Sequence, residues 1–182
     1  MSKILFAAVA CMAAAAPPVS TRGSTQATQT VLTCRISTAA GQPVTFTPAV
    51  GFLPRTVTAQ GTLVLTGCSG TAPSAANLRS GRLTVHGSGR AFCTGVQNIR
   101  GKGQITWYGA DGREAGVSAL RPEAGQVRSH NPGDMLLSGR IVKGPLAGAR
   151  TAGTATPTSN VSTCATRGIT GVHGAGTMTF SL

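Results

Sequence analysis

Basic side chains are the groups in this sequence best suited to binding chemistry, because they far outnumber the acidic ones. The 182 residues include sixteen Lys and Arg against four Asp and Glu, a formal net charge of +12. Such an excess predicts an anionic partner, although a coding bias toward Arg on a solvated surface would give the same count. Four basic residues fall on the outward faces of expected strands and would form one binding face if those strands are neighbours: Arg82, His86, Lys102 and Arg140.

The partners that suit such a face are an anionic cell-wall polymer, an acidic polysaccharide or a phospholipid surface. Nucleic acid is disfavoured, because single-strand binding usually combines basic residues with aromatic side chains on which bases stack. Aromatic residues make up only 4% of the chain and do not alternate with the basic ones. The oligomeric state is left open.

Two of the acidic residues could in principle act as a glycosidase pair, but their position argues against this role. All four acids lie between Asp111 and Asp134, and Asp111 and Glu114 flank an expected hairpin tip. Solvent at a hairpin tip would keep both carboxylates ionised, so neither could donate the proton that glycoside hydrolysis needs. We therefore interpret them as turn and surface residues.

The serines, histidines and cysteines form no recognisable catalytic or metal-binding pattern. The sequence has no G-x-S-x-G elbow, no C-x-x-C pair and no Cys/His cluster at zinc-ligand spacing. The tripeptide Gly101-Lys102-Gly103 lacks the length and the following helix of a phosphate-binding loop. The sequence predicts no catalytic residue, no metal ligand and no cofactor.

Three functional hypotheses follow from these patterns. The favoured one is a secreted, non-catalytic binding or structural module, with an anionic extracellular or cell-wall partner as the first candidate. A second is a small extracellular hydrolase whose site assembles from distant loops, which loss of turnover in a His130→Ala variant would support. The third is a secreted inhibitor or toxin that acts through an exposed loop, for which residues 121–134 are the natural candidate.

Residues 1–27 have the organisation of an export signal. Lys3 is followed by an uncharged apolar run at residues 4–16, which two prolines end. This run is too short for a membrane anchor and has the length of a signal-peptide core. We expect a secreted, extracellular protein with no transmembrane anchor.

The cleavage site of this signal has three alternatives. Small residues favour a cut after Ala27, and a cut nearer Ala16 would also fit. A lipoprotein signal would instead make Cys11 the lipidated residue. With the cut after Ala27, residues 28–182 remain, which is the length of a single domain.

Four cysteines lie beyond the expected signal, and an even number in an exported chain predicts two disulfides. Four cysteines allow three connectivities, and the sequence does not decide among them. We choose Cys34–Cys68 and Cys93–Cys164 as a working assignment. In the chain-entropy model each such bond would contribute about 4 kcal/mol.

The stretch 101–118 contains the only Trp and the only Tyr of the chain, and it predicts a β-hairpin. Its residues alternate in character, so that Ile105 and Trp107 share one face. The following Asp111-Gly112 suits a tight turn, because both residues tolerate positive φ. We expect a return strand at 113–120 and a buried Trp107, rather than an exposed Trp that stacks on a sugar ring.

Short runs of alternating apolar and polar residues recur about every dozen residues, and no stretch has a convincing helical period. This spacing predicts an all-β fold, an antiparallel β-sandwich that is Ig-like or jelly-roll-like, with about eight to ten strands. Residues 57–65 have their inward positions at odd numbers, whereas Cys68 is even. A β-bulge at Gly67 would restore the alternation.

The order of these motifs along the chain has one further implication. The motifs are Thr33-Cys34, Gly61–Cys68, Gly87–Cys93, Gly101–Trp107 (GKGQITW), Gly139–Gly148, Cys164 and Gly174–Phe180. In this order they resemble a group of small uncharacterised secreted proteins of actinobacteria, over nearly all of residues 28–182. The resemblance implies an exported β domain, and it brings no activity and no site residue with it.

Overall fold

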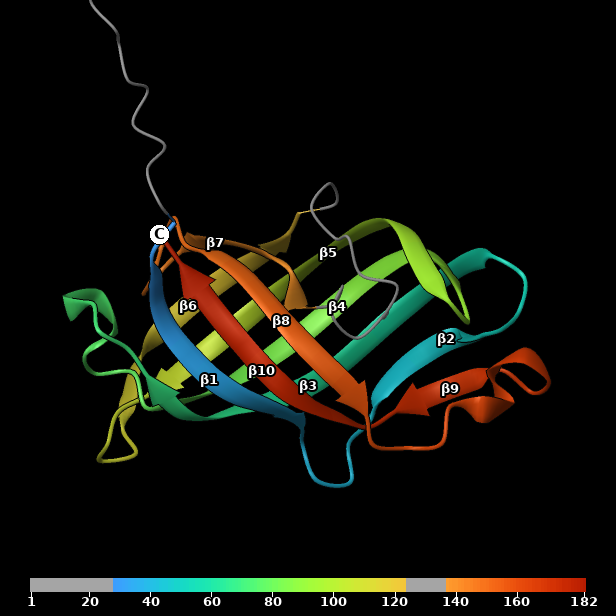
Figure 1. Ribbon diagram of the computed structural model, residues 1–182, viewed down its shortest axis with the longest axis horizontal. Helices are drawn as coiled ribbons and strands as arrows, with labels where there is room; N and C mark the ends of the chain where they lie inside the picture. The colour runs from blue at the N-terminus through green and yellow to red at the C-terminus, as the bar shows by residue number, and fades with distance from the viewer. Residues whose placement is uncertain (1–27, 124–136) are drawn as a thin grey trace, which may run out of the picture.

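The computed structural model describes residues 28–123 and 137–182, so the expected export signal lies outside the described residues. The described chain is all-β, with ten strands and two short 3-10 helices (Figure 1). The elements are β1 (Thr30–Thr38), β2 (Val44–Val50), β3 (Arg55–Ser69), η1 (Pro73–Ala75), β4 (Ser80–Phe92), β5 (Gly95–Tyr108), β6 (Glu114–Pro122), β7 (Gly139–Lys143), β8 (Arg150–Pro157), η2 (Ser162–Ala165), β9 (Ile169–Val172) and β10 (Gly174–Ser181). None of the helices in this part of the chain has the length and apolar character needed to cross a membrane.

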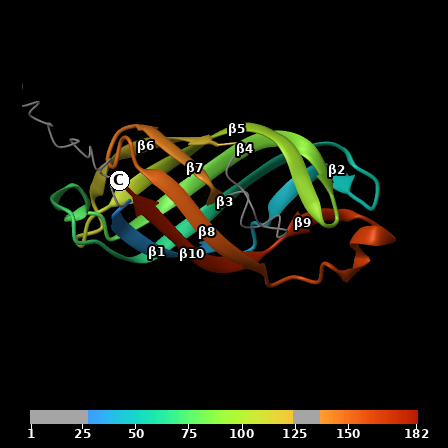
Figure 2. The same cartoon turned by 45° about the horizontal axis from the view of Figure 1, so that its top comes forward.

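The strands form one antiparallel sheet that closes on itself, which corrects the predicted β-sandwich. The sheet runs in the order β1-β10-β8-β7-β6-β5-β4-β3, and β3 pairs again with β1, so these eight strands make a closed barrel. Figure 2 shows β8 and β10 on one side of the interior and β4 and β5 on the other. Alternation along a strand marks one buried face in a sandwich and in a barrel alike. Only the pairing of β1 with β3 decides between the two.

The length of β3 lets it serve two partners. Its second half, residues 63–69, pairs with β1, whereas residues 58–60 in its first half pair with β2. β2 in turn pairs with β9, so these two strands extend the sheet beside one end of the barrel (Figure 1).

Trp107 lies in the hydrophobic core, as the hairpin pattern predicts. Its side chain is fully buried, and its ring meets that of Phe180 edge to face, with 5.4 Å between the ring centroids. The indole Nε1–H donates to Ser118 Oγ at 2.8 Å, and this hydroxyl donates to the Pro145 carbonyl at 2.6 Å. β5 and β6 flank a turn in which Gly112 has a φ of +74°, so the predicted hairpin is confirmed. We call the half of the barrel around Trp107 and Phe180 the packed end.

The two disulfides join the cysteines of the working assignment, Cys34–Cys68 and Cys93–Cys164. The first connects β1 to β3 inside the core of the packed end, where Cys34 is fully buried. The second connects the turn between β4 and β5 to η2. The two bonds therefore act on different parts of the barrel.

The predicted bulge at Gly67 is present in β3. Thr33 of β1 pairs with Ser69, but Arg35 pairs with Thr66, so β3 has one extra residue at this point. Gly67 has a φ of +57°, a left-handed conformation that glycine adopts without strain. The bulge turns the Cys68 side chain inward, where it bonds to Cys34. This disulfide joins β3 to β1, the two strands whose pairing closes the barrel.

Replacing Gly67 with Ala is expected to lower the free energy of unfolding by about 1 kcal/mol, because a Cβ is disfavoured at this positive φ. The atoms nearest the new Cβ would belong to the Arg35 guanidinium, the first at 3.2 Å, and that flexible group can move. Urea unfolding would measure the loss. Gly67→Asn is the matched control, since Asn tolerates left-handed φ better and should lose less. Equal losses for the two variants would contradict the assigned backbone strain.

Candidate functional site

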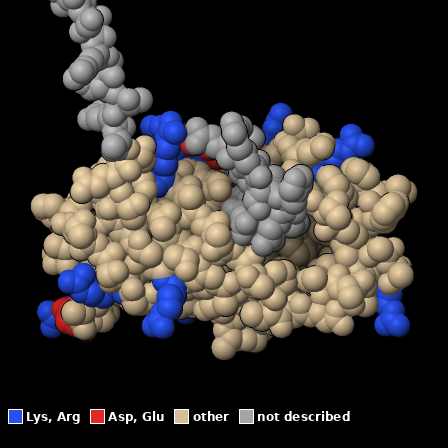
Figure 3. Space-filling model, in the orientation of Figure 1, with Lys and Arg blue, Asp and Glu red and all other residues tan. Residues whose placement is uncertain are grey.

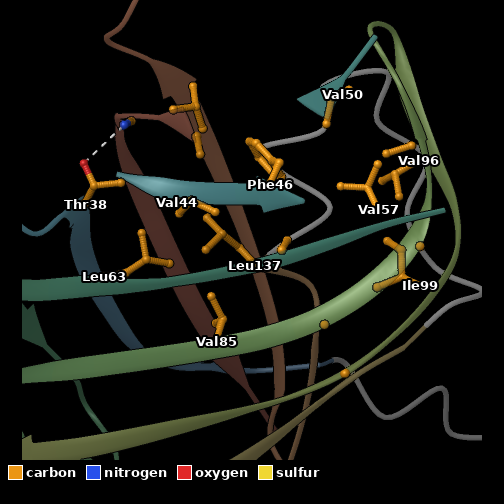
Figure 4. Close-up of a pocket in the computed structure, with 18 of the residues that line it drawn as sticks. Thr38, Val44, Phe46, Val50, Val57, Leu63, Val85, Val96, Ile99 and Leu137 are labelled. Carbon is orange, nitrogen blue, oxygen red and sulfur yellow. Dashed lines mark hydrogen bonds between the residues drawn. The ribbon is translucent and has the colours of Figure 1, made fainter. Parts of the chain in front are cut away.

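An apolar cavity of about 230 Å³ occupies the end of the barrel beside β2 and β9, which we call the cavity end. Figure 4 shows side chains from separate elements turned toward this space, among them Phe46 of β2, Val57 of β3, Val85 of β4 and Leu137. The interior of an eight-stranded barrel is just wide enough to be filled by side chains or to hold one small ligand. This barrel is filled at the packed end and hollow at the cavity end.

The hollow arises because the inward cross-strand pairs of β4 and β5 lose side-chain volume toward the cavity end. From the packed end to the cavity end, the inward cross-strand pairs are Gly81↔Trp107, Leu83↔Ile105, Val85↔Gly103 and Gly87↔Gly101. The glycines add no side chain to the interior. A Cβ added to Gly87 would lie 2.8 Å from the Arg100 carbonyl oxygen, so a larger residue would also push the two backbones apart.

The Cys93–Cys164 disulfide holds the outer part of the cavity end. Both cysteines line the cavity, and the Cys93 N–H donates to the Gly51 carbonyl at 3.0 Å. Gly51 belongs to the connection between β2 and β3. Three connections therefore meet at this bond, those from β2 to β3, from β4 to β5 and from β8 to β9, and they form the cavity wall together.

One hydrogen-bonded polar pair belongs to the predominantly apolar lining. Thr38 Oγ1 and His173 Nδ1 are 3.1 Å apart, and both residues line the cavity (Figure 4). The Gly174 N–H also donates to Thr38 Oγ1, at 3.4 Å. These groups bond to one another, so the apolar side chains decide which class of ligand the cavity suits.

The structure brings three of the four predicted binding residues onto neighbouring strands. Arg82 and His86 lie on β4 and Lys102 lies on β5, with His86 directly opposite Lys102. Arg140 lies on β7, separated from β5 by β6, and its guanidinium contacts Glu123 at 3.3 Å. Figure 3 shows Lys and Arg side chains around the outline of the face in view, along both its upper and its lower edge.

The strand register adds two arginines that the sequence analysis did not select. Arg121 of β6 pairs with Arg140, and Arg140 pairs with Arg150 of β8. The expected exposed loop at residues 121–134 begins too early, because β6 continues to Pro122. The remainder of the predicted loop, from residue 124 on, lies outside the described residues.

The alternation of inward and outward residues along β6 could have identified Arg121 as an outward strand residue. Ser118 and Leu120 are both buried, so the next outward residue after Ala119 is Arg121. Proline at position 122 and the polar residues after it suggested that the strand had ended. The cavity also had a signal, since Gly87, Gly101 and Gly103 all fall at inward positions of two strands whose other halves carry bulky residues.

The residues considered for catalysis are spread apart where the structure describes them. Asp111 and Glu114 are exposed at the β5–β6 turn, and Asp111 Oδ1 accepts from the Arg113 N–H at 3.0 Å. Within residues 28–123 and 137–182, no group of three or more His, Cys, Asp or Glu side chains is arranged to hold a metal ion. His130 lies outside these ranges, so the hydrolase hypothesis stays a prediction.

Comparisons of the chain with protein-family models, with curated proteins and with solved structures found no match.

Proposed function

We propose that this protein is an exported, non-catalytic binding module that holds one small apolar molecule at the cavity end of the barrel. The observation that carries the proposal is the cavity itself, hollow and walled by apolar side chains of at least five strands. Pockets of this kind, mostly apolar with few polar groups, are the usual binding sites of small molecules. Two disulfides support export, because such bonds persist mainly in oxidising compartments.

The cavity volume limits the size of the ligand. A dry apolar cavity of about 150 Å³ accepts benzene. At about 230 Å³ this cavity is half as large again, which leaves room for a ring with a short alkyl chain or a chain of similar bulk. Charged ligands are disfavoured, because the described lining is predominantly apolar and would compensate poorly for the loss of their hydration.

A series of alkylbenzenes, from toluene to hexylbenzene, tests this proposal by isothermal titration calorimetry. Each methylene added inside the cavity should tighten binding about fourfold, since burial of one CH₂ is worth about 0.8 kcal/mol. The gain should stop at the member that fills the cavity, and longer members should bind no better. No measurable binding, or affinity that rises without a limit as on an open surface, would contradict the proposal.

Val85→Trp provides the matching variant, because the Val85 side chain points into the cavity from β4 (Figure 4). The indole should occupy room otherwise used by about two methylenes, so butylbenzene should bind about 15-fold more weakly and the best ligand should become shorter. Thr84→Trp is the control, since Thr84 is exposed on the outward face of the same strand. Equal weakening by both variants would place the binding outside the cavity.

A further inference from the structure

The outward basic residues of the barrel lie in a single row that crosses five consecutive strands. His86 of β4 pairs with Lys102 of β5, and Arg140 of β7 pairs with Arg121 of β6 and with Arg150 of β8. The remaining step, from Lys102 to Arg121, is one residue beyond the pair Gly103↔Leu120 in the same register. We call these five residues the basic row. Neighbouring strands are about 4.8 Å apart, so four steps span about 19 Å.

Such a row is unfavourable for the isolated barrel. Like charges directly opposite each other on adjacent strands repel and lower stability. Four members of the row carry a permanent positive charge, and one of them, Arg140, contacts the Glu123 carboxylate. Asp111 and Glu114 lie at the far hairpin turn and do not neutralise the row. A partner that supplies regularly spaced negative charge would remove this repulsion.

We propose that the basic row binds a linear acidic polysaccharide laid across the strands, a function separate from ligand binding in the cavity. The row crosses five strands, and its outward neighbours along β4 and β5 are Thr84, Ser88 and Gln104, with Arg100 as one further cation, so it matches an extended chain better than a planar lipid surface. Cations repeat along it about every 4.8 Å, so successive acidic groups of one polymer can reach successive strands.

The composition of the row favours a polysaccharide over a nucleic acid. Proteins that bind single strands of nucleic acid combine basic residues with aromatic side chains on which bases stack. Within the described ranges, no member of the row and no residue directly flanking it along β4 or β5 is aromatic; Tyr108 is six positions from Lys102 along β5. Arginine and lysine alone suit carboxylate and sulfate groups, which they bind by charge-assisted hydrogen bonds.

Fluorescence anisotropy with labelled oligogalacturonate, and with a labelled heparin oligosaccharide as a sulfated probe, tests this proposal. Wild-type protein should bind at least one of them, and binding should weaken as salt rises. In the double variant Lys102→Gln, Arg121→Gln, the slope of log K against log salt should become shallower by about 1.4, at about 0.7 for each lost contact. With equal affinities for wild type and variant at 1 M salt, this change of slope corresponds to about 25-fold weaker binding at 0.1 M salt.

The double variant Arg79→Gln, Arg167→Gln is the matched control, because it removes the same charge from two exposed residues outside the row. It should bind nearly as well as the wild type. Equal losses of affinity in both double variants would show a general charge effect and would contradict binding at the basic row. The melting temperature gives a second readout: relief of repulsion should leave the row variant at least as stable as the wild type, and a large fall would contradict the unfavourable charge arrangement.

Two competing partners complete the test as separate arms. Binding to an oligothymidylate of similar length that is tighter than to either polysaccharide would replace the proposal with a nucleic-acid surface. Preferential binding to vesicles containing phosphatidylglycerol would replace it with a lipid surface. Absence of binding to both acidic polysaccharides at low salt would also overturn it.

Discussion

Replacing Trp107 with Ala should lower the free energy of unfolding by about 3–5 kcal/mol, the range typical of a large buried aromatic residue cut to a methyl group. The side chain is fully buried, it contacts the Phe180 ring, and it fills the packed end of the barrel. Whole domains are usually stable by only about 5–15 kcal/mol, so this one change removes a large share of the total. Urea unfolding, followed by far-UV circular dichroism, would measure it.

Trp107→Phe separates the packing contribution from the hydrogen bond. Phe keeps an aromatic ring against Phe180 but loses the Nε1–H that donates to Ser118 Oγ. Ser118 still donates to the Pro145 carbonyl, so no buried donor is left without a partner. We expect this variant to lose clearly less stability than Trp107→Ala. A loss of less than about 1 kcal/mol in the Ala variant would mean that Trp107 is not the centre of the core.

Removing the Cys93–Cys164 bond by a double substitution to Ser should cost about 4 kcal/mol, because the bond closes a loop with a sequence separation of 71 residues. The same change should weaken alkylbenzene binding, since both cysteines line the cavity and hold three connections together. Guanidinium unfolding gives the stability, and calorimetry gives the affinity, each below the temperature at which the variant begins to unfold.

The matched control is the double substitution of Cys34 and Cys68 to Ser. This bond has a sequence separation of 34 and lies in the core of the packed end, away from the cavity lining. Its loss should also cost about 4 kcal/mol, while leaving alkylbenzene affinity nearly unchanged in the fraction that stays folded. Unchanged affinity without Cys93–Cys164 would show that the bond does not shape the cavity.

Local patterns predicted the parts of the fold that depend on neighbouring residues. Alternation around Ile105 and Trp107, followed by Asp111-Gly112, was enough to predict the hairpin and the burial of the indole. The change of parity before Cys68 was enough to predict the bulge at Gly67. These features need only the period of a strand and the conformational freedom of glycine.

The closure of the barrel could not be predicted in the same way. It depends on the pairing of Ile36 with Leu65, a contact between two distant segments that each look like any half-buried strand. The basic row could not be predicted for the same reason. Lys102, Arg121 and Arg140 become neighbours only when the register of three strands is fixed, and a shift of one residue would turn each of them inward. The cavity depends on which inward positions are glycine, which matters only once the strands enclose a space.

An isotope-filtered NOE experiment with bound butylbenzene tests most directly whether one barrel contains both a packed end and an apolar binding cavity. The ligand protons should show NOEs to the methyl groups of Val57, Val85 and Leu137, which surround the cavity. They should show none to Leu32 or Leu65, which are fully buried near Trp107. NOEs to the packed end, or only to exposed residues such as Phe52, would contradict this account.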